Sequence, residues 1–277
     1  MRFDHRHIRD LLRRSLLVVL TVGCIFQTPA PGQVSVALLD EHLAFPEGEF
    51  RGRLTHALRA SESDGPFTEE ARSPTDVRAA VWDIVLYVRG TNRLYEFHNR
   101  ANGLVARYLV LTEGRQLWYA DVLRNRLRRV EGVAETESLL GTAFSFYDLA
   151  GFGLEGDSNG ARAEPYVVGQ RNYAKLNMEM LRPAGYARIV ALTDPAVNQR
   201  PLRLDYYNTD RILYKTLAFA YNREIAVTPE SAGTLAVPVR LEMVDLTAAA
   251  VSRLAWYEYH ADLIPEAAVF DPRYLMP

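Results

Sequence analysis

The sequence predicts a mainly β protein, with minor helical content, built on one curved antiparallel sheet of about eleven strands. Three observations lead to this fold class. Apolar and polar residues alternate with period two from about residue 80 onward, turn-forming residues separate these segments, and the segments follow one another at hairpin spacing. With 277 residues, of which 48% are hydrophobic and 24% charged, the chain can bury a sizeable core.

Residues 1–32 have the composition of an export signal. A basic start with five Arg and two Asp precedes an apolar run from Ser15 to Phe26, which is too short to span a bilayer comfortably. The whole chain has a formal net charge of −2, so residues 33–277 carry −5 once the +3 of this segment is removed. We therefore expect an exported protein with no nucleic-acid partner.

Cys24 is the single cysteine and lies at the end of the apolar run. The sequence Thr21-Val-Gly-Cys24 resembles a bacterial lipobox, with Thr21 in place of the usual Leu. Small residues at 30–32 offer a second cleavage point that would release a free periplasmic protein, and an uncleaved anchor is a third alternative. Membrane contact is then either peripheral or through a lipid attached to Cys24.

The strand pattern is clearest from Tyr173 to Leu181. Leu176, Met178 and Met180 alternate there with polar residues, so one face meets core or ligand and the other meets water. The same pattern predicts strands at 50–59, 82–89, 93–98, 104–111, 115–121, 126–130, 186–193, 202–207, 212–221, 235–245 and 251–259.

Two segments interrupt this pattern and are expected to be helical: 36–44 and 135–149. Closing about eleven strands into a barrel leaves an interior too wide for side chains alone to fill. Helices, a ligand or both must occupy it, and two short helical segments are few for the area available. The sequence therefore predicts an apolar cavity.

From residue 82 to the C-terminus the chain resembles the LolA-like outer-membrane lipoprotein-sorting protein family. The most specific motif is Leu140-Gly-Thr-Ala-Phe-Ser-Phe-Tyr-Asp-Leu149, which is similar to the family's Gly-Thr-x-Phe-Ser followed by Tyr-x-Asp-Leu. Two further matches precede this motif, at 115–121 and 126–130. Five more follow it in order, at 173–176, 201–207, 214–217, 238–245 and 264–275. The first 80 residues depart from the family pattern.

The resemblance implies a single lipid-binding domain over residues 33–277, in which an open half-barrel holds acyl chains on its concave face under lid helices. Candidate lid residues are Leu38, Leu39, Leu139, Leu140 and Phe144. Candidate cavity-lining residues are Trp82, Ile84, Leu86, Leu117, Leu176, Met178, Met180, Leu204 and Tyr206. Without the resemblance, packed core is the ordinary interpretation of such apolar strand faces, so both interpretations stay open here.

The chain offers little evidence for catalysis. Gly156-Asp-Ser158-Asn resembles the nucleophile block of Gly-Asp-Ser lipases, but it sits mid-chain, and His260 precedes Ala-Asp rather than following an Asp at the expected spacing. The histidines lack metal-ligand spacing, and no phosphate loop or dinucleotide fingerprint is present. We expect no enzyme activity, no catalytic residue, no metal and no cofactor.

Two functions follow from these observations. The first is a periplasmic or membrane-tethered carrier or acceptor that binds the acyl chains of a lipoprotein or another lipid and moves them toward the outer membrane, with an inner-membrane exporter as a further partner. The second is an envelope docking protein that uses the same sheet to bind a protein and transports nothing.

Overall fold

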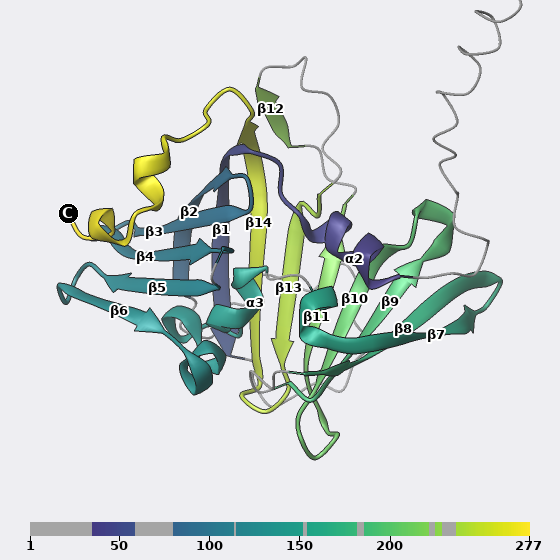
Figure 1. Cartoon of the computed structure of the whole chain (residues 1–277). Coiled ribbons are helices and arrows are strands. Elements are labelled where there is room, and N and C mark those ends of the chain that lie inside the picture. Colours follow the sequence, from purple (N-terminus) through teal and green to yellow (C-terminus); the bar gives the residue numbers. More distant parts are fainter. Residues whose placement is uncertain are drawn as a thin grey trace, which may run out of the picture. The chain divides into compact units, whose positions relative to one another are not determined.

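The computed structural model describes residues 35–58, 80–113, 115–151, 154–181, 186–221, 225–228 and 237–277, which belong to one compact unit, Val34–Pro277. The expected export signal and Cys24 lie outside the described residues. The chain folds into a single sheet of fourteen strands that curves around a few short helices (Figure 1).

The strands of this sheet are β1 Gly48–Leu58, β2 Ala80–Arg89, β3 Asn92–Asn99, β4 Gly103–Leu111, β5 Gln116–Asp121, β6 Arg126–Val130, β7 Ser158–Val168, β8 Arg171–Met180, β9 Arg188–Asp194, β10 Arg200–Tyr207, β11 Leu213–Ala220, β12 Ala226–Thr228, β13 Arg240–Asp245 and β14 Ala250–His260. Short turns join several consecutive strands, among them β2 to β3, β3 to β4, β5 to β6 and β7 to β8. The α-helices are α2 Val36–Leu43, α3 Phe146–Ala150 and α4 Leu154–Asp157. The 3₁₀ helices are η1 Gly132–Thr136, η2 Leu139–Gly141, η3 Pro195–Val197, η5 Ala267–Phe270 and η6 Pro272–Tyr274.

The strand order is β6-β5-β4-β3-β2-β1-β14-β13-β11-β10-β9-β8-β7, and all of these neighbours are antiparallel. The first and last long strands pair at the centre, where Phe50 of β1 lies opposite Tyr259 of β14. The short strand β12 pairs with β14 in the parallel direction, so the expected purely antiparallel sheet has this one exception. The path runs from β6 to β7, which makes these two strands its ends.

The expected count of about eleven strands was too low. The structure adds β7 and β12 to the strands at the predicted positions. β7 is exposed along most of its length and contains Pro165, features tolerated at a sheet edge that break the apolar alternation. β12 has three residues, too few to show any period.

The two predicted helical segments have different outcomes. Residues 36–43 form α2 as expected. Residues 135–149 do not form one helix: they fold as the end of η1, then η2, then α3. Leu140 has φ of 55° and Gly141 has φ of 74°, and this left-handed backbone ends helical growth before α3 begins.

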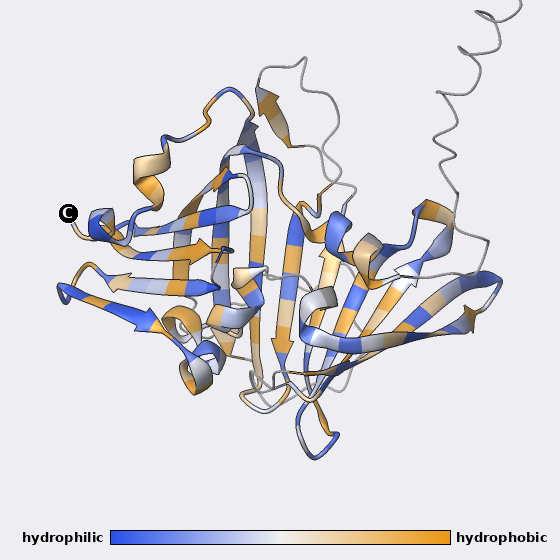
Figure 2. Ribbon diagram, in the orientation of Figure 1, coloured by the Kyte–Doolittle hydropathy of each residue, from blue (hydrophilic) through white to orange (hydrophobic). Residues whose placement is uncertain are grey.

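Each strand presents alternate residues to an inner and an outer face, visible as alternating hydropathy along the arrows in Figure 2. The inner face holds the main hydrophobic core, and the helical segments pack on it. A smaller outer cluster joins Leu94 and Leu109 to the C-terminal Phe270 and Leu275. Arg107 fixes this tail, because its Nη1 donates to the carbonyl oxygens of Tyr274 and Leu275, each at 3.1 Å.

The segment between the two edge strands, residues 131–157, is called the β6–β7 connection below. β6 and β7 stand at opposite ends of the strand order, so the chain must pass from one end of the sheet to the other. It does so across the inner face, where its apolar side chains join the main core (Figure 1). This path places the connection where a ligand of the half-barrel would lie.

Candidate functional site

Two buried tyrosines attach the β6–β7 connection to the sheet. The Tyr95 hydroxyl donates a hydrogen bond to the carbonyl oxygen of Leu149 at 3.0 Å, and the Tyr108 hydroxyl donates to that of Phe146 at 2.6 Å. Burial raises the pKa of both phenols, so they remain protonated donors. They satisfy carbonyl groups of a helix too short to pair its own.

A second set of polar contacts fixes the start of α3. Asp148 and Ser145 form a capping box there, and the Tyr186 hydroxyl donates to Asp148 Oδ1 at 2.5 Å. The Lys215 ammonium lies 3.6 Å from Asp148 Oδ2 and donates to the carbonyl oxygen of Ala143 at 2.9 Å. Since both charged side chains are buried, each compensates the desolvation of the other.

The candidate lid residues therefore occupy two different settings. Leu139 and Phe144 are fully buried in the anchored connection, and Leu140 is partly buried against the core. Leu39 of α2 is buried, whereas the side chain of Leu38 lies outside the described part of the chain. α2 is attached through buried Val36 and Leu39 and through a hydrogen bond from the Leu154 amide to Asp40 Oδ1 at 2.8 Å.

A largely apolar cavity of about 230 Å³ lies beneath α2. We call it the α2 cavity. Leu43 and Phe45 form its cover, and α3 and α4 form one wall. The remaining apolar lining comes from the inner face of the sheet: Tyr95, Leu204, Tyr206, Leu217, Phe219, Leu241, Leu254 and Trp256.

The α2 cavity also contains a polar group that the surrounding side chains leave unused. Trp256 is buried, and its indole Nε1 has no hydrogen-bond partner among the described residues. The Trp256 ring packs edge-on against Phe45, with ring centroids 5.8 Å apart. The cavity thus combines largely apolar walls with a buried donor that a ligand carbonyl can use, and its polar lining residues are Asp40, Thr91, Arg93, Thr112 and Asp148.

The predicted cavity-lining residues all belong to the inner face, but the structure divides them. Leu204 and Tyr206 line the α2 cavity, and Trp82 lines the second pocket described below. The others pack in the main core without lining either pocket: Ile84, Leu86, Leu117, Leu176, Met178 and Met180.

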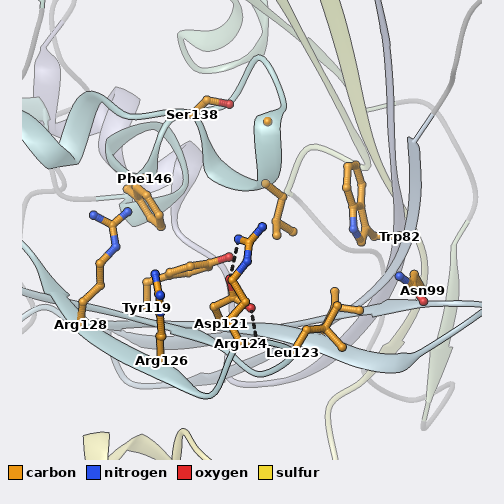
Figure 3. A pocket seen from close by; sticks show the side chains of 13 residues that line it. Trp82, Asn99, Tyr119, Asp121, Leu123, Arg124, Arg126, Arg128, Ser138 and Phe146 are labelled. Atoms are coloured by element: carbon orange, nitrogen blue, oxygen red, sulfur yellow. Dashed lines mark hydrogen bonds and ion pairs between the residues drawn. The ribbon is translucent and has the colours of Figure 1, made fainter.

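A second pocket of about 610 Å³ lies at the β5–β6 end of the inner face (Figure 3). We call it the arginine groove, because Arg124, Arg126 and Arg128 line it beside Asp121. Its apolar lining comes from Trp82, Val105, Tyr119, Leu123, Leu140 and Phe146, and Asn99, Ser138 and Gly141 complete it. Arginines on a strand usually lie on a solvent-exposed face. The sequence contains no signal that distinguishes such a face from a groove.

The sequence pattern also missed several residues of the α2 cavity. Trp256 and Phe45 line the cavity, but neither is among the residues predicted to do so, and Phe45 precedes the first strand without belonging to any motif. The alternation Ser252, Leu254, Trp256 on β14 shares the inner face, and this period-two signal could have identified the last two as lining residues.

Ser158 does not meet a base in this structure. Its Oγ is buried with no hydrogen-bond partner among the described residues. The neighbouring Asp157 Oδ2 instead accepts from Tyr147 at 2.9 Å and from Arg115 at 2.8 Å, contacts that attach α4 to α3 and to Arg115 just before β5.

Two searches of the part of the chain that the structure describes gave negative results. No group of three or more His, Cys, Asp or Glu side chains there is placed to hold a metal ion. In that same part, no helix has both the length and the apolar character needed to cross a membrane.

Comparison with known proteins identifies a family and a fold. A family model whose description is "Uncharacterized protein" matches residues 90–276. No curated protein matches the chain.

Three solved structures share the fold at low sequence identity. A domain named for outer membrane lipoprotein sorting, from Vibrio parahaemolyticus, has a TM-score of 0.64 and 15% identity, covering 87% of this chain and 97% of its own. A DUF1329 family protein from Desulfovibrio piger has a TM-score of 0.67 and 14% identity, covering 90% and 100%. A LolA superfamily protein from Nitrosomonas europaea has a TM-score of 0.63 and 18% identity, covering 88% and 100%. The expected LolA-like open half-barrel is confirmed as the fold.

Proposed function

Because this chain belongs to the family whose model matches residues 90–276 and has the LolA-like fold, we propose that it is an acyl-chain carrier or acceptor of the bacterial envelope. The observation that carries this proposal is the α2 cavity, a largely apolar space between α2 and the inner face of the sheet.

Acyl binding follows from the chemistry of the cavity walls. Each CH₂ group that leaves water for such a site contributes about 0.8 kcal/mol, so a chain is retained without any covalent step. The free indole Nε1–H of Trp256 supplies a donor for the ester or amide carbonyl that joins an acyl chain to its head group. No residue of the cavity has to act as a catalyst.

Loading requires α2 to move. The cavity of about 230 Å³ is smaller than typical ligand pockets, so a long acyl chain needs a wider space. α2 has eight residues and is held mainly by buried Val36 and Leu39 and by a 2.8 Å hydrogen bond from the Leu154 amide to Asp40 Oδ1. The β6–β7 connection is attached at many more points, so α2 is the cover that opens.

The cellular setting of this proposal rests on the N-terminal sequence. The basic start and apolar run of residues 1–32 direct the chain out of the cytoplasm, and residues 33–277 form the lipid-binding domain. Lipidation of Cys24 would tether the protein as an acceptor or relay, whereas cleavage after Gly32 would release a periplasmic shuttle. An inner-membrane exporter is the natural donor of cargo for either form.

Fluorescence quenching by brominated fatty acids tests the proposal, because bromine quenches tryptophan only at short range. The chain has three Trp, of which Trp256 lines the α2 cavity and Trp82 lines the arginine groove. Trp82→Phe removes the tryptophan of the arginine groove, so quenching in this variant reports on the α2 cavity. We expect saturable quenching in Trp82→Phe and its loss in the double variant Trp82→Phe with Trp256→Phe. Absence of saturable quenching in Trp82→Phe would refute acyl binding in this cavity.

A docking protein without cargo is the second candidate, and one observation favours it. Most predicted cavity-lining residues are packed core, with Leu176 and Met178 fully buried against neighbouring side chains. Native mass spectrometry of protein purified gently from envelopes separates the candidates. Bound lipid at one molecule per protein supports the carrier, whereas lipid-free protein that also excludes the brominated probe supports the docking role.

A further inference from the structure

The arginine groove is distinct from the α2 cavity, although both border the β6–β7 connection. Phe146 at the start of α3 lines the groove, whereas Tyr147 and Leu149 of the same helix line the cavity. The two lining sets share no residue. An inference about the groove therefore stands independently of acyl binding in the α2 cavity.

The cationic side of the groove is built by strand alternation. Arg126 and Arg128 of β6 lie on the same face as buried Val130, and they lie opposite Asp121 and Tyr119 of β5 in the antiparallel register. Period-two alternation therefore directs both guanidinium groups to the inner side, where Figure 3 shows them entering the pocket.

The arginines of the groove differ in how their charge is balanced. Arg124 Nη1 lies 3.0 Å from Asp121 Oδ2, and Arg128 Nη2 lies 2.7 Å from Glu137 Oε2. Arg126 has no ion pair with any carboxylate in the described part of the chain, although Asp121 is its neighbour across the strands. Its planar guanidinium is the charge left to bind an anion, in the two-point geometry that suits phosphate or carboxylate.

The remaining lining of the groove is mainly aromatic and apolar. The Arg128 guanidinium lies over the rings of Tyr119 and Phe146, at 5.8 Å and 5.3 Å from their centroids, which fixes both rings beside the cationic side. Trp82 and the exposed Leu123 extend this apolar surface (Figure 3). A volume of about 610 Å³ is in the usual range for a small-molecule site.

We propose that the arginine groove binds an anionic amphiphile, with Arg126 holding a phosphate or carboxylate and the Trp82–Phe146 surface holding the adjoining apolar group. A ligand with only one of these features would satisfy only part of the groove. A purely apolar ligand would leave the Arg126 charge without a partner, and a small inorganic anion would leave the aromatic surface in water. An anionic phospholipid has both features in one molecule.

Isothermal titration with soluble short-chain lipids tests this site. The probes are dihexanoyl phosphatidylglycerol, dihexanoyl phosphatidylcholine and inorganic phosphate, added to the parent protein, Arg126→Gln and Arg129→Gln. Arg129 is the matched control, because it lies on the same strand but alternates to the other face and pairs with Glu131. A thermal melt of each variant confirms folding.

We expect phosphatidylglycerol to bind the parent and Arg129→Gln equally, and Arg126→Gln at least tenfold more weakly. Phosphatidylcholine and inorganic phosphate should each bind the parent at least tenfold more weakly than phosphatidylglycerol. Equal affinity of the two variants would overturn the assignment to Arg126. Inorganic phosphate that bound as tightly as phosphatidylglycerol would identify a site for free anions. Phosphatidylcholine that bound as tightly would show that the net charge of the lipid does not determine its affinity. Either result would overturn the proposal. Because acyl binding in the α2 cavity is measured by quenching of Trp256 in the Trp82→Phe protein, a negative result for the groove does not affect that measurement.

Discussion

The ammonium nitrogen of Lys215 lies 3.6 Å from the Asp148 carboxylate inside the half-barrel, where both side chains are almost completely buried. The pair joins strand β11 to the N-terminus of α3. Asp148 is also bonded by Tyr186 and by its own helix cap, so the pair belongs to a satisfied polar network and not to an isolated ion pair. This network holds the β6–β7 connection against the sheet.

Replacing Lys215 by Met should therefore destabilise the protein strongly. Removing one partner leaves Asp148 as a buried charge without its cation, and such changes cost about 3 kcal/mol or more. The double variant Lys215→Met with Asp148→Asn should recover part of this loss, because no uncompensated charge remains. Urea unfolding of the parent, both single variants and the double variant measures the effect. A Lys215→Met protein as stable as the parent would show that the pair is unimportant.

The inner-face hydrogen bonds were beyond prediction for a physical reason. Period two assigns Lys215 to the same face as Leu217, but a buried lysine breaks the apolar pattern and becomes favourable only once Asp148 and a carbonyl oxygen are known to lie above it. Most strands were predictable because one face of the strand is buried and the other is exposed to solvent, which gives an alternating sequence pattern. β7 was not, since an exposed edge strand has no apolar face to reveal it.

The same argument applies to the pockets. Alternation placed Leu204, Leu176 and Trp82 on the inner face, yet it could not tell lining from core, because that depends on what packs opposite each residue. Leu176 is packed in the main core and lines neither pocket, whereas Leu204 lines the α2 cavity. What packs opposite each residue depends on the strand order and on the path of the β6–β7 connection, which single-strand patterns do not contain.

Filling the α2 cavity should remove acyl binding without unfolding the protein. Leu217→Phe adds volume at the cavity wall, so in the Trp82→Phe background we expect at least a tenfold loss of brominated fatty acid affinity and a change in stability within about 1.5 kcal/mol. Leu176→Met is the matched control, because Leu176 is a buried inner-face residue that lines neither pocket. Equal affinities in the two variants would argue against the cavity as the binding site.

Loosening α2 should speed ligand exchange. In Asp40→Ala the Leu154 amide loses its 2.8 Å hydrogen bond to the α2 side chain, a change that costs about 1 kcal/mol. If α2 is the cover, the association and dissociation rates of the acyl probe should both rise severalfold in stopped-flow fluorescence, with a smaller change in affinity. Unchanged rates would mean that another segment controls entry.

Folding stability should fall in mild acid partly because of His56. Burial lowers the pKa of this imidazole below its usual value of 6.5, and its Nδ1 lies 2.9 Å from the Ser252 hydroxyl, which accepts from the Ala143 amide. The unfolded chain then takes up its proton at higher pH than the folded chain, so stability decreases as pH falls through about 6.5 toward the folded pKa. His56→Gln should flatten this decrease in unfolding free energy between about pH 7.5 and 5.5. An identical slope in both proteins would exclude His56 as its source.

Gly52 makes room for the aromatic floor of the α2 cavity. It lies opposite Trp256 at a register shift between β1 and β14, and a Cβ placed there would meet the Trp256 Cε3 and the Ala255 carbonyl oxygen, each at 2.6 Å. Gly52→Ala should therefore cost about 1–3 kcal/mol, move the indole, and change both the tryptophan emission and the acyl affinity. Gly156→Ala is the matched control, because a Cβ at that exposed position meets no atom within 4 Å, and it should leave all three measurements unchanged. If Gly52→Ala behaved like Gly156→Ala, the indole would not depend on this glycine for its position, and the close approach of the two strands would have no bearing on ligand binding.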